Sequence, residues 1–513
     1  MKRHLRSNDV RKRSRSRAND GRSRLVTGAF DTKNQAGSTA FAHLSIIGVD
    51  VNRDTDNPRY RAAKEIVIAL RAAGHQAYFA GGCVRDLLLG VEPKDFDVAT
   101  SARPDVVMAM FAKTYSVGAH FGVVLVCTPA DDIEIATEIA TFRHDGAYSD
   151  GRRPDAVRFS TDPREDVLRR DFTINGMLLD PLILEQTGDV AAATLDYVNG
   201  REDLAAGVLR AIGEPALRFA EDKLRMLRAV RFAARLELEI EAQTMAAIRA
   251  SAPEIVQVSS ERVRDELTLM LTEGHARRAF ELLDATGLLA FVLPEALRLK
   301  GVAQPPQYHP EGDVWVHTML LLEKLKPGAS PTLAWGALLH DIGKPATFRP
   351  PDPKKPGDRI RFDGHVEVGV RMAEEILRRL RFSNEDTEQI VALVKNHMRF
   401  GDVLQMREST LKRFLRLPGF DEHLALHWMD ASSAHGDLQL YVFAKQHYEA
   451  TPVETMKPTL LVTGKDLIAA GYHPGPEFKT MLEAAEDAQL EGRVATTEDG
   501  LAVVRERFGA PHS

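Results

Sequence analysis

The chain has 513 residues, 44% of them hydrophobic, and a net charge of −6, the composition of a globular protein with three or more packing units. No apolar run approaches the roughly 20 residues of a membrane-spanning helix, so we exclude a helical membrane protein and expect no membrane partner. The only cysteines, Cys83 and Cys127, cannot form a disulfide framework and predict a reducing, cytoplasmic location.

Residues 1–57 are predicted to form a basic disordered tail and linker. Residues 1–24 contain ten Lys and Arg against two Asp, a net charge of +8, so the rest of the chain carries −14. A solvated arm is the expected form, with a non-specific RNA tether and an Arg- and Ser-rich transit peptide as alternatives. An acidic body of this kind can bind RNA only through a local basic groove.

The segment 58–190 predicts a small α/β domain with a mixed sheet. Residues 59–74 have the periodicity of an amphipathic helix that ends at Gly74, and residues 76–82 form a buried strand that leads into a glycine turn and a helix. Further strands are expected at 95–100, 121–128, 133–142 and 155–160, with a helix at 104–113.

Two aspartates lie two positions apart on the predicted strand 95–100. Asp95 and Asp97 are therefore expected to point to the same face, where two carboxylates repel unless a cation neutralises them. Ligands that are all oxygen favour Mg²⁺ or Mn²⁺ over zinc. Gly81 and Gly82 would let backbone N–H groups approach a phosphate at a helix start, and Arg85 would bind the same triphosphate.

The string GGCVRDLLLG…DFDVAT, residues 81–100, resembles the signature of the polymerase-β nucleotidyltransferase superfamily. The resemblance is to its class II branch, which contains CCA-adding enzymes and bacterial poly(A) polymerases. Later motifs agree in order and cover about residues 78–299: RRDFTING (169–176), with Gly176 where the family usually has Ala, EDKLRMLRAVRF (221–232) and SSERVRDEL (259–267).

This resemblance implies roles for individual residues. Asp95 and Asp97 would hold two metal ions for attack of an RNA 3′-hydroxyl on the α-phosphate of a nucleotide. A third carboxylate is expected; Glu138 is preferred, and Glu134 and Asp171 stay open. Asp222 and Arg225 would select the base, since an acceptor and a forked donor can satisfy the Watson–Crick edge of C or A. The expected nucleotide ligands also include Gly82, Arg85, Arg170, Arg228 and Arg231.

Within the family, three details favour CCA addition to tRNA from CTP and ATP with Mg²⁺. Residues 143–159 resemble the flexible loop of CCA- and A-adding enzymes, and residues 115–126 resemble the CCA-type strand pair. The basic string that is typical of bacterial poly(A) polymerases is absent. An A-adding enzyme or a poly(A) polymerase, which would use ATP alone, is the alternative.

A second set of metal-ligand residue types lies in the helical block 305–440. His340 and Asp341 are adjacent at the end of an apolar helix, and the other candidates are His317, His365, His397 and Asp430. The set resembles the HD phosphohydrolase superfamily, which implies one or two divalent ions and hydrolysis of a phosphoester such as a 2′,3′-cyclic phosphate. Mixed imidazole and carboxylate ligands favour a divalent transition metal: Mn²⁺, Fe, Co²⁺ or Ni²⁺. A phosphohydrolase whose head only grips RNA is the alternative from another functional class.

The sequence thus predicts an α+β fold, in which a polymerase-β-like α/β nucleotidyltransferase head is followed by an all-helical neck, body and HD domain. Residues 345–357 are expected to form a loop or an extended hairpin. The predicted boundaries are 1–57 for the tail and linker, 58–190 for the head, 191–304 for the neck and body that select nucleotides and bind RNA, 305–440 for the HD domain and 441–513 for a C-terminal helical tail.

Overall fold

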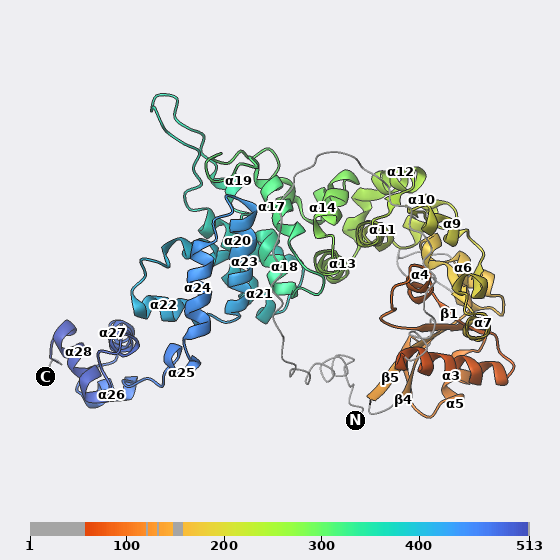
Figure 1. Cartoon of the computed structure of the whole chain (residues 1–513), viewed down its shortest axis with the longest axis horizontal. Coiled ribbons are helices and arrows are strands. Elements are labelled where there is room, and N and C mark those ends of the chain that lie inside the picture. Colours follow the sequence, from red (N-terminus) through yellow and green to blue (C-terminus); the bar gives the residue numbers. More distant parts are fainter. Residues whose placement is uncertain (1–56, 119–121, 131–132, 147–156, 511–513) are drawn as a thin grey trace. The chain divides into compact units, whose positions relative to one another are not determined.

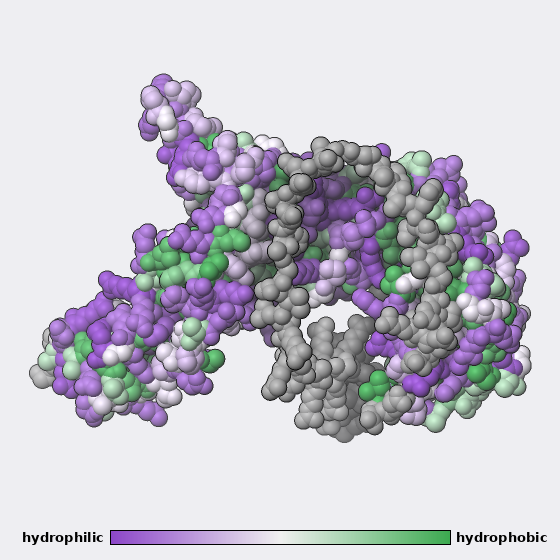
Figure 2. Space-filling model, viewed as in Figure 1, coloured by the Kyte–Doolittle hydropathy of each residue, from purple (hydrophilic) through white to green (hydrophobic). Residues whose placement is uncertain are grey.

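The structure is a computed structural model that describes residues 57–118, 122–130, 133–146 and 157–510 (Figure 1). Residues 1–56 of the predicted tail and linker, and residues 147–156 of the predicted flexible loop, lie outside the described residues. Within those ranges, no helix combines the length and the apolar character that crossing a membrane requires. In the coloured part of the surface in Figure 2, hydrophilic residues predominate and hydrophobic residues lie in separate areas.

A seven-stranded mixed sheet forms the core of the head, which confirms the predicted fold class. Its order is β3-β4-β5-β2-β1-β8-β9; β2 and β5 are parallel and all other neighbours are antiparallel. The last two strands were not predicted, and β9 carries the sheet beyond residue 190. The strands of the sheet are β1 (Ala77–Ala80), β2 (Asp97–Thr100), β3 (Thr114–Gly118), β4 (Val123–Ala130), β5 (Ile133–Thr141), β8 (Met177–Leu179) and β9 (Thr194–Asp196).

Helix α3 (Pro58–Ala72) covers one side of this sheet. Pro58 is in the first turn, and the Asn57 side chain accepts a hydrogen bond from the Arg59 backbone N–H at 2.8 Å, which caps the helix. The buried Tyr60 ring meets Phe79 of β1 edge-on, with 5.4 Å between ring centroids. The other head elements are α4 (Gly82–Leu88), α5 (Pro104–Met110), α6 (Pro163–Leu168), α7 (Pro181–Thr187), α8 (Val190–Ala193) and the hairpin strands β6 (Arg143–Asp145) and β7 (Val157–Phe159).

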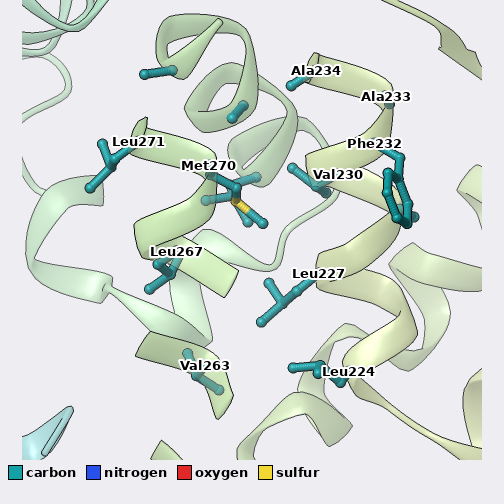
Figure 3. Close-up of a cluster of buried hydrophobic side chains, with 14 of the residues drawn as sticks. Leu224, Leu227, Val230, Phe232, Ala233, Ala234, Val263, Leu267, Met270 and Leu271 are labelled. Carbon is teal, nitrogen blue, oxygen red and sulfur yellow. The ribbon is translucent and has the colours of Figure 1, made fainter. Parts of the chain in front are cut away.

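The neck and body are helical apart from a two-stranded pair, as the periodicity predicts. Leu227 and Val230 of α11 pack against Leu267 and Met270 of α13 (Figure 3). Burying an aliphatic side chain of this size contributes about 1.5–3 kcal/mol. The elements are α9 (Gly200–Ala205), β10 (Val208–Leu209), α10 (Pro215–Glu221), α11 (Leu224–Arg235), β11 (Glu239–Ile240), α12 (Ala242–Ser251), α13 (Ser260–Thr272), α14 (Ala276–Ala285), α15 (Leu289–Val292) and α16 (Pro294–Leu297).

The HD domain and the C-terminal segment are also helical. Between α19 and α20 the backbone groups of Arg349 and Arg361 exchange two hydrogen bonds, so the predicted loop at 345–357 is closed by a hairpin-like bridge. The helices are α17 (Val314–Glu323), α18 (Pro331–Leu339), α19 (Lys344–Thr347), α20 (His365–Arg379), α21 (Asn384–Asn396), α22 (Glu408–Leu415), α23 (Phe420–Ser433), α24 (Gln439–Ala450), α25 (Val453–Met456), α26 (Gly464–Ala469), α27 (Phe478–Leu490) and α28 (Thr497–Phe508).

Candidate active sites

The glycine turn of the head adjoins the aspartate strand. Strands β1 and β2 are antiparallel, and Ala80 pairs with Asp97, so the turn that follows Ala80 begins beside this carboxylate. Gly81 has φ +77°, a conformation that side chains other than glycine rarely adopt. A Cβ at Gly81 would also lie 3.2 Å from Nη1 of Arg170. The turn therefore needs glycine both for its backbone and for the close approach of a guanidinium group.

Arg170 is held beside the turn by a buried carboxylate. Its Nη2 donates to Oδ2 of Asp166 at 3.0 Å, and Arg169 donates to the other oxygen. Although burial opposes ionisation of Asp166, Arg170 and Arg169 keep the pKa of this carboxyl below its usual value. The predicted phosphate ligand Arg170 thus lies against Gly81, with an orientation fixed by Asp166.

Asp97 and Glu138 are neighbours on parallel strands. Val98 pairs with Ile139, and both side chains are buried, so the residues before them, Asp97 and Glu138, share the opposite face. Desolvation, together with the charges of Glu138 and Asp95, raises the pKa of Asp97 to about 6, against the opposing effect of Arg170. Desolvation also raises the pKa of Glu138. Both side chains reach the surface, although the protein around each carboxylate excludes part of its water.

Asp95 does not lie on the strand. Strand β2 begins at Asp97, so the expectation that a shared strand orients both aspartates was wrong. Asp95 still acts electrostatically on Asp97 from the segment that precedes the strand. The carboxylates of Asp95, Asp97 and Glu138 therefore interact, and the charge of Arg170 opposes their mutual repulsion at Asp97. Such a group of oxygen ligands suits a hard divalent ion. Among the described residues, however, the clusters with all ligand atoms within 4.8 Å of one another lie in the HD domain, so the head carboxylates are spaced more widely.

The other two candidates for the third carboxylate have different partners. Glu134 forms an exposed ion pair with Lys113. Asp171 is buried, and its Oδ2 lies 2.7 Å from Nη2 of Arg228. Despite burial, Arg228 holds the pKa of Asp171 below its ordinary value. Of the three candidates, Glu138 is the one that adjoins Asp97, and its catalytic role stays a prediction.

Two of the predicted nucleotide ligands are built into internal contacts. Arg85 is 3% exposed and donates to Asp86 and Asn175. Its Nη2 lies 3.6 Å from the position of a Cβ on Gly82, so Arg85 supports the glycine turn from beneath. Arg231 is buried between Glu266 and Glu273, with N–O distances of 2.7 and 3.1 Å. Binding of a nucleotide by Arg85 or Arg231 would require these contacts to open.

The predicted base-selecting pair lies where α10 passes into α11. Asp222 caps the end of α10, and the Arg225 backbone N–H donates to its carbonyl at 3.0 Å. Arg225 donates through its guanidinium to Glu221 and to the carbonyl oxygen of Arg169. These contacts with Glu221, Asp222 and Arg169 fix the orientation of Arg225.

Arg262 of α13 is a contact that sequence reasoning missed. Its two terminal nitrogens donate to the two oxygens of Asp222, at 3.2 and 2.7 Å. A bidentate pair of this kind fixes the plane of the carboxylate. The signal was available, because the motif SSERVRDEL supplies an arginine that could neutralise the acidic start of EDKLR.

The HD domain brings all six predicted ligands together. They come from α17, the junction of α18 and α19, the starts of α20 and of the 3-10 helix 397–402, and α23. These six residues form two clusters, each with its ligand atoms within 4.8 Å of one another, and a third such group joins His317 to His309 and Glu311. The first cluster is His317, His340 and Asp430; the second cluster is Asp341, His365 and His397.

The histidine rings of the HD clusters have fixed orientations. Nδ1 of His340, His365 and His397 each lies 2.7–2.9 Å from a backbone carbonyl oxygen, which can only accept. Each Nε2 is therefore free of a proton when the ring is neutral and can bind a metal. Nε2 of His317 and Nε2 of His340 are buried, and each lies 3.1 Å from a carboxylate oxygen, of Asp430 and of Asp341 respectively, as expected around a bound cation. These donors fit a divalent transition metal.

Lys344 is a further buried group that sequence reasoning missed. Its Nζ lies 2.7 Å from Oδ2 of Asp341 and 2.7 Å from Oε1 of Gln304. Although burial opposes ionisation, His340 and Lys344 hold the pKa of Asp341 well below its ordinary value. Lys344 follows Asp341 by three residues in HDIGK, and this spacing was the available signal.

Three family models match successive parts of the chain. The description "Poly A polymerase head domain" matches residues 77–210, "Probable RNA and SrmB- binding site of polymerase A" matches residues 237–299, and "HD domain" matches residues 313–417. Their order agrees with the head, body and HD domain described above.

Two curated relatives match nearly end to end, and a third matches about half of the chain. The CCA-adding enzyme of Bacillus pumilus is 30% identical over 456 residues, which are 87% of this chain and 97% of the relative. That of Levilactobacillus brevis is 30% identical over 444 residues, 86% of this chain and 96% of the relative. The enzyme of Geobacillus thermodenitrificans is 41% identical over 235 residues, 46% of this chain and 55% of the relative.

Solved structures agree with these matches. The Bacillus stearothermophilus CCA-adding enzyme in complex with CTP is 28% identical, has a TM-score of 0.66, and is matched over 88% of this chain and 98% of its own. The Thermotoga maritima CCA-adding enzyme complexed with tRNA shares the fold, with 18% identity, a TM-score of 0.51, and coverage of 89% of this chain and 97% of its own.

Proposed function

This chain belongs to the family of CCA-adding enzymes, which are tRNA nucleotidyltransferases, and we propose that it adds C, C and A to tRNA 3′ ends from CTP and ATP. The observation that carries the proposal is the group of coupled carboxylates beside the glycine turn. Desolvation, and then the charges of Glu138 and Asp95, raise the pKa of Asp97 to about 6, and a bound cation would offset both effects.

The residues of the head have complementary parts in this proposal. Asp95, Asp97 and Glu138 would hold Mg²⁺, which when bound supplies charge neutralisation for displacement of pyrophosphate by the RNA 3′-hydroxyl. The turn at Gly81 and Gly82 and the guanidinium of Arg170 would bind the triphosphate. Arg228 is partly exposed beside the buried Asp171 and would extend this basic surface.

Selection of the base would rest on Asp222 and Arg225. A carboxylate and a guanidinium together present acceptors and donors to the Watson–Crick edge of C or A, and they leave G and U with mismatched groups. Arg262 supports this assignment, because its two hydrogen bonds keep the Asp222 carboxylate in one plane.

A nucleotide-omission assay tests the proposal. A tRNA transcript that ends before CCA is incubated with Mg²⁺ and with CTP, ATP or both. We expect addition of two residues with CTP alone and of the complete CCA with both nucleotides. Extension by ATP alone into a run of A, with no use of CTP, would instead identify an A-adding enzyme or a poly(A) polymerase.

We propose phosphoester hydrolysis as a second activity, located in the HD domain. The supporting observation is the presence of two imidazole–carboxylate clusters whose histidines are oriented by Nδ1 hydrogen bonds. The clusters would hold divalent transition metal ions, which when bound supply an activated water for attack on phosphorus. The test is hydrolysis of a 2′,3′-cyclic phosphate at an RNA end with Mn²⁺, Co²⁺ or Ni²⁺, in which water opens the ring to a phosphomonoester. An absence of hydrolysis with every metal would leave the domain a structural or RNA-docking role.

The predicted cytoplasmic location belongs to the same proposal. Cys83 and Cys127 are both free thiols, which is the state expected in a reducing compartment.

A further inference from the structure

Glu311 lies on a loop that the fold fixes beside the first HD cluster. Ala303 and Asp313 form a β-bridge, and the Gln304 backbone N–H donates to the carbonyl of Gly312 at 2.9 Å, which closes the loop at its base. The Glu311 side chain is 6% exposed. Glu311 is not one of the six predicted ligands.

Glu311 contacts Nδ1 of His317, the ring nitrogen that faces away from the first cluster. Its Oε1 lies 2.7 Å from Nδ1 of His317 and 2.9 Å from Nδ1 of His309. Because a carboxylate can only accept, Nδ1 of His317 donates and its Nε2 faces Asp430 at 3.1 Å. The same oxygen thus accepts from two imidazole rings, an arrangement that favours the ionised form of the carboxylate.

The two clusters therefore differ in the groups behind their histidines. In the second cluster, His365 and His397 donate to the neutral carbonyl oxygens of Phe362 and Val394. In the first cluster, His317 donates to an ionised carboxylate, while His340 donates to the carbonyl of Ala337. A carboxylate behind an imidazole raises its basicity as a ligand more than a neutral carbonyl does, and such partners change metal affinity by about 10–100-fold.

We propose that Glu311 is a positioning residue that makes the cluster of His317, His340 and Asp430 bind a divalent transition metal more tightly than the cluster of Asp341, His365 and His397. The inference rests on the proposed metal binding of the HD domain, and it assigns an order to the two clusters. The first cluster fills at low metal concentration, and the second fills only at higher concentration.

Titration with Co²⁺ tests this order without any assay of activity. The full chain carries Asp95→Ala, Asp97→Ala and Glu138→Ala, which remove the three predicted head ligands. Binding is followed by calorimetry and by the visible absorption of bound Co²⁺. We expect two binding events. Glu311→Gln should weaken the tighter event by about 10–100-fold and leave the weaker one unchanged. His365→Asn, which alters only the second cluster, should instead remove the weaker event.

Two matched variants separate the charge of Glu311 from the loop that carries it. His309→Gln removes the other contact of the same oxygen and should leave both affinities unchanged. Glu311→Asp keeps the charge and should retain part of the tight affinity, and it serves in place of Glu311→Gln if circular dichroism shows that the latter does not fold.

The outcomes that overturn the inference are distinct from failure of the proposed HD activity. Unchanged affinities in Glu311→Gln, equal losses at both events, or the same loss in His309→Gln would each overturn it. A protein that binds two Co²⁺ ions in this order but hydrolyses no phosphoester would sustain the inference while removing the proposed activity. A protein that binds no metal in the HD domain would overturn both.

Discussion

The two candidate metal sites of this chain are built in opposite ways. In the HD domain, each of the two clusters of predicted ligands contains two histidines and one aspartate, and Nδ1 of each histidine is fixed by a hydrogen bond. In the head, carboxylates of like charge gather beside a glycine turn, and Asp95 lies outside the strand that carries Asp97. The HD site is thus preorganised by the protein, whereas the head site collects negative charge without fixing a ligand geometry.

This difference indicates how each site acquires its metal. A buried set of oriented imidazoles can bind a transition metal without substrate. Mg²⁺ is usually bound by one or two carboxylates together with substrate phosphates and water. The more widely spaced carboxylates of the head suit an ion that arrives with the nucleotide triphosphate. The raised pKa of Asp97 reflects its desolvation and the neighbouring charges of Glu138 and Asp95, which such an ion would offset.

The largest effect is expected from removal of a head carboxylate. Asp97→Ala should lower addition of C to tRNA by about 1,000-fold or more, since loss of a metal ligand costs on the order of 4 kcal/mol of barrier. Single-turnover incorporation of labelled CTP measures this. Glu134→Ala is the matched control, because Glu134 lies on β5 with Glu138 but pairs with Lys113. Near-normal incorporation by Asp97→Ala would show that the carboxylate is not a catalytic ligand.

The reciprocal loss is expected in the HD domain. His340→Ala combined with Asp341→Ala removes one ligand from each cluster and should abolish hydrolysis of a 2′,3′-cyclic phosphate, while CCA addition continues. Both reactions are measured on the same preparation, with Mg²⁺ and with added Mn²⁺. If this variant remains folded yet loses nucleotide addition, the two sites are coupled and the contrast between independent centres is incorrect.

Metal removal should destabilise the two regions unequally. A metal present at 100 to 1,000 times its dissociation constant stabilises the state that binds it by about 3–4 kcal/mol. Chelation of a transition metal should therefore increase hydrogen exchange in α17 and α20, and leave β2 unchanged in the absence of nucleotide. Hydrogen exchange is measured by mass spectrometry of the peptides. Equal increases of exchange in α20 and β2 would contradict the view that the HD centre is preorganised and that the head site is completed by its substrate.

The fold and the identity of the site residues follow from local patterns in the sequence. Alternation and glycine turns predicted β1, β2, β4 and β5, and helical periodicity predicted the neck. The strands β8 and β9 were missed because each has three residues, which is too short for a periodic signal. The start of β2 was misjudged for a different reason. The alternation of DFDVAT begins at Asp95, whereas pairing with β1 begins at Asp97.

The partners of the site residues were much less predictable. The sequence gives no sign that Arg85 is enclosed by Asp86 and Asn175, because Asn175 is 90 residues away along the chain. Glu311 was missed for the same reason, since its role comes from its contact with His317. Arg262 lies in a recognised motif, but its pairing with Asp222 comes from tertiary packing. Residue type and spacing predict which groups can bind a ligand, whereas tertiary packing decides which of them are already engaged.

The smallest effect we predict is on the choice of base, and it extends the contrast between the two regions to specificity. Asp222→Ala should relax discrimination against UTP and GTP by about 1–3 kcal/mol, the value of a lost pair of hydrogen bonds to a base edge. Misincorporation on a tRNA primer measures this, and cyclic phosphate hydrolysis should not change. Because Arg262 fixes the Asp222 carboxylate, Arg262→Ala should relax selectivity in the same direction but by less. Unchanged selectivity in Asp222→Ala, together with a large rise in the dissociation constant for nucleotide, would make this carboxylate part of triphosphate binding and not of base recognition.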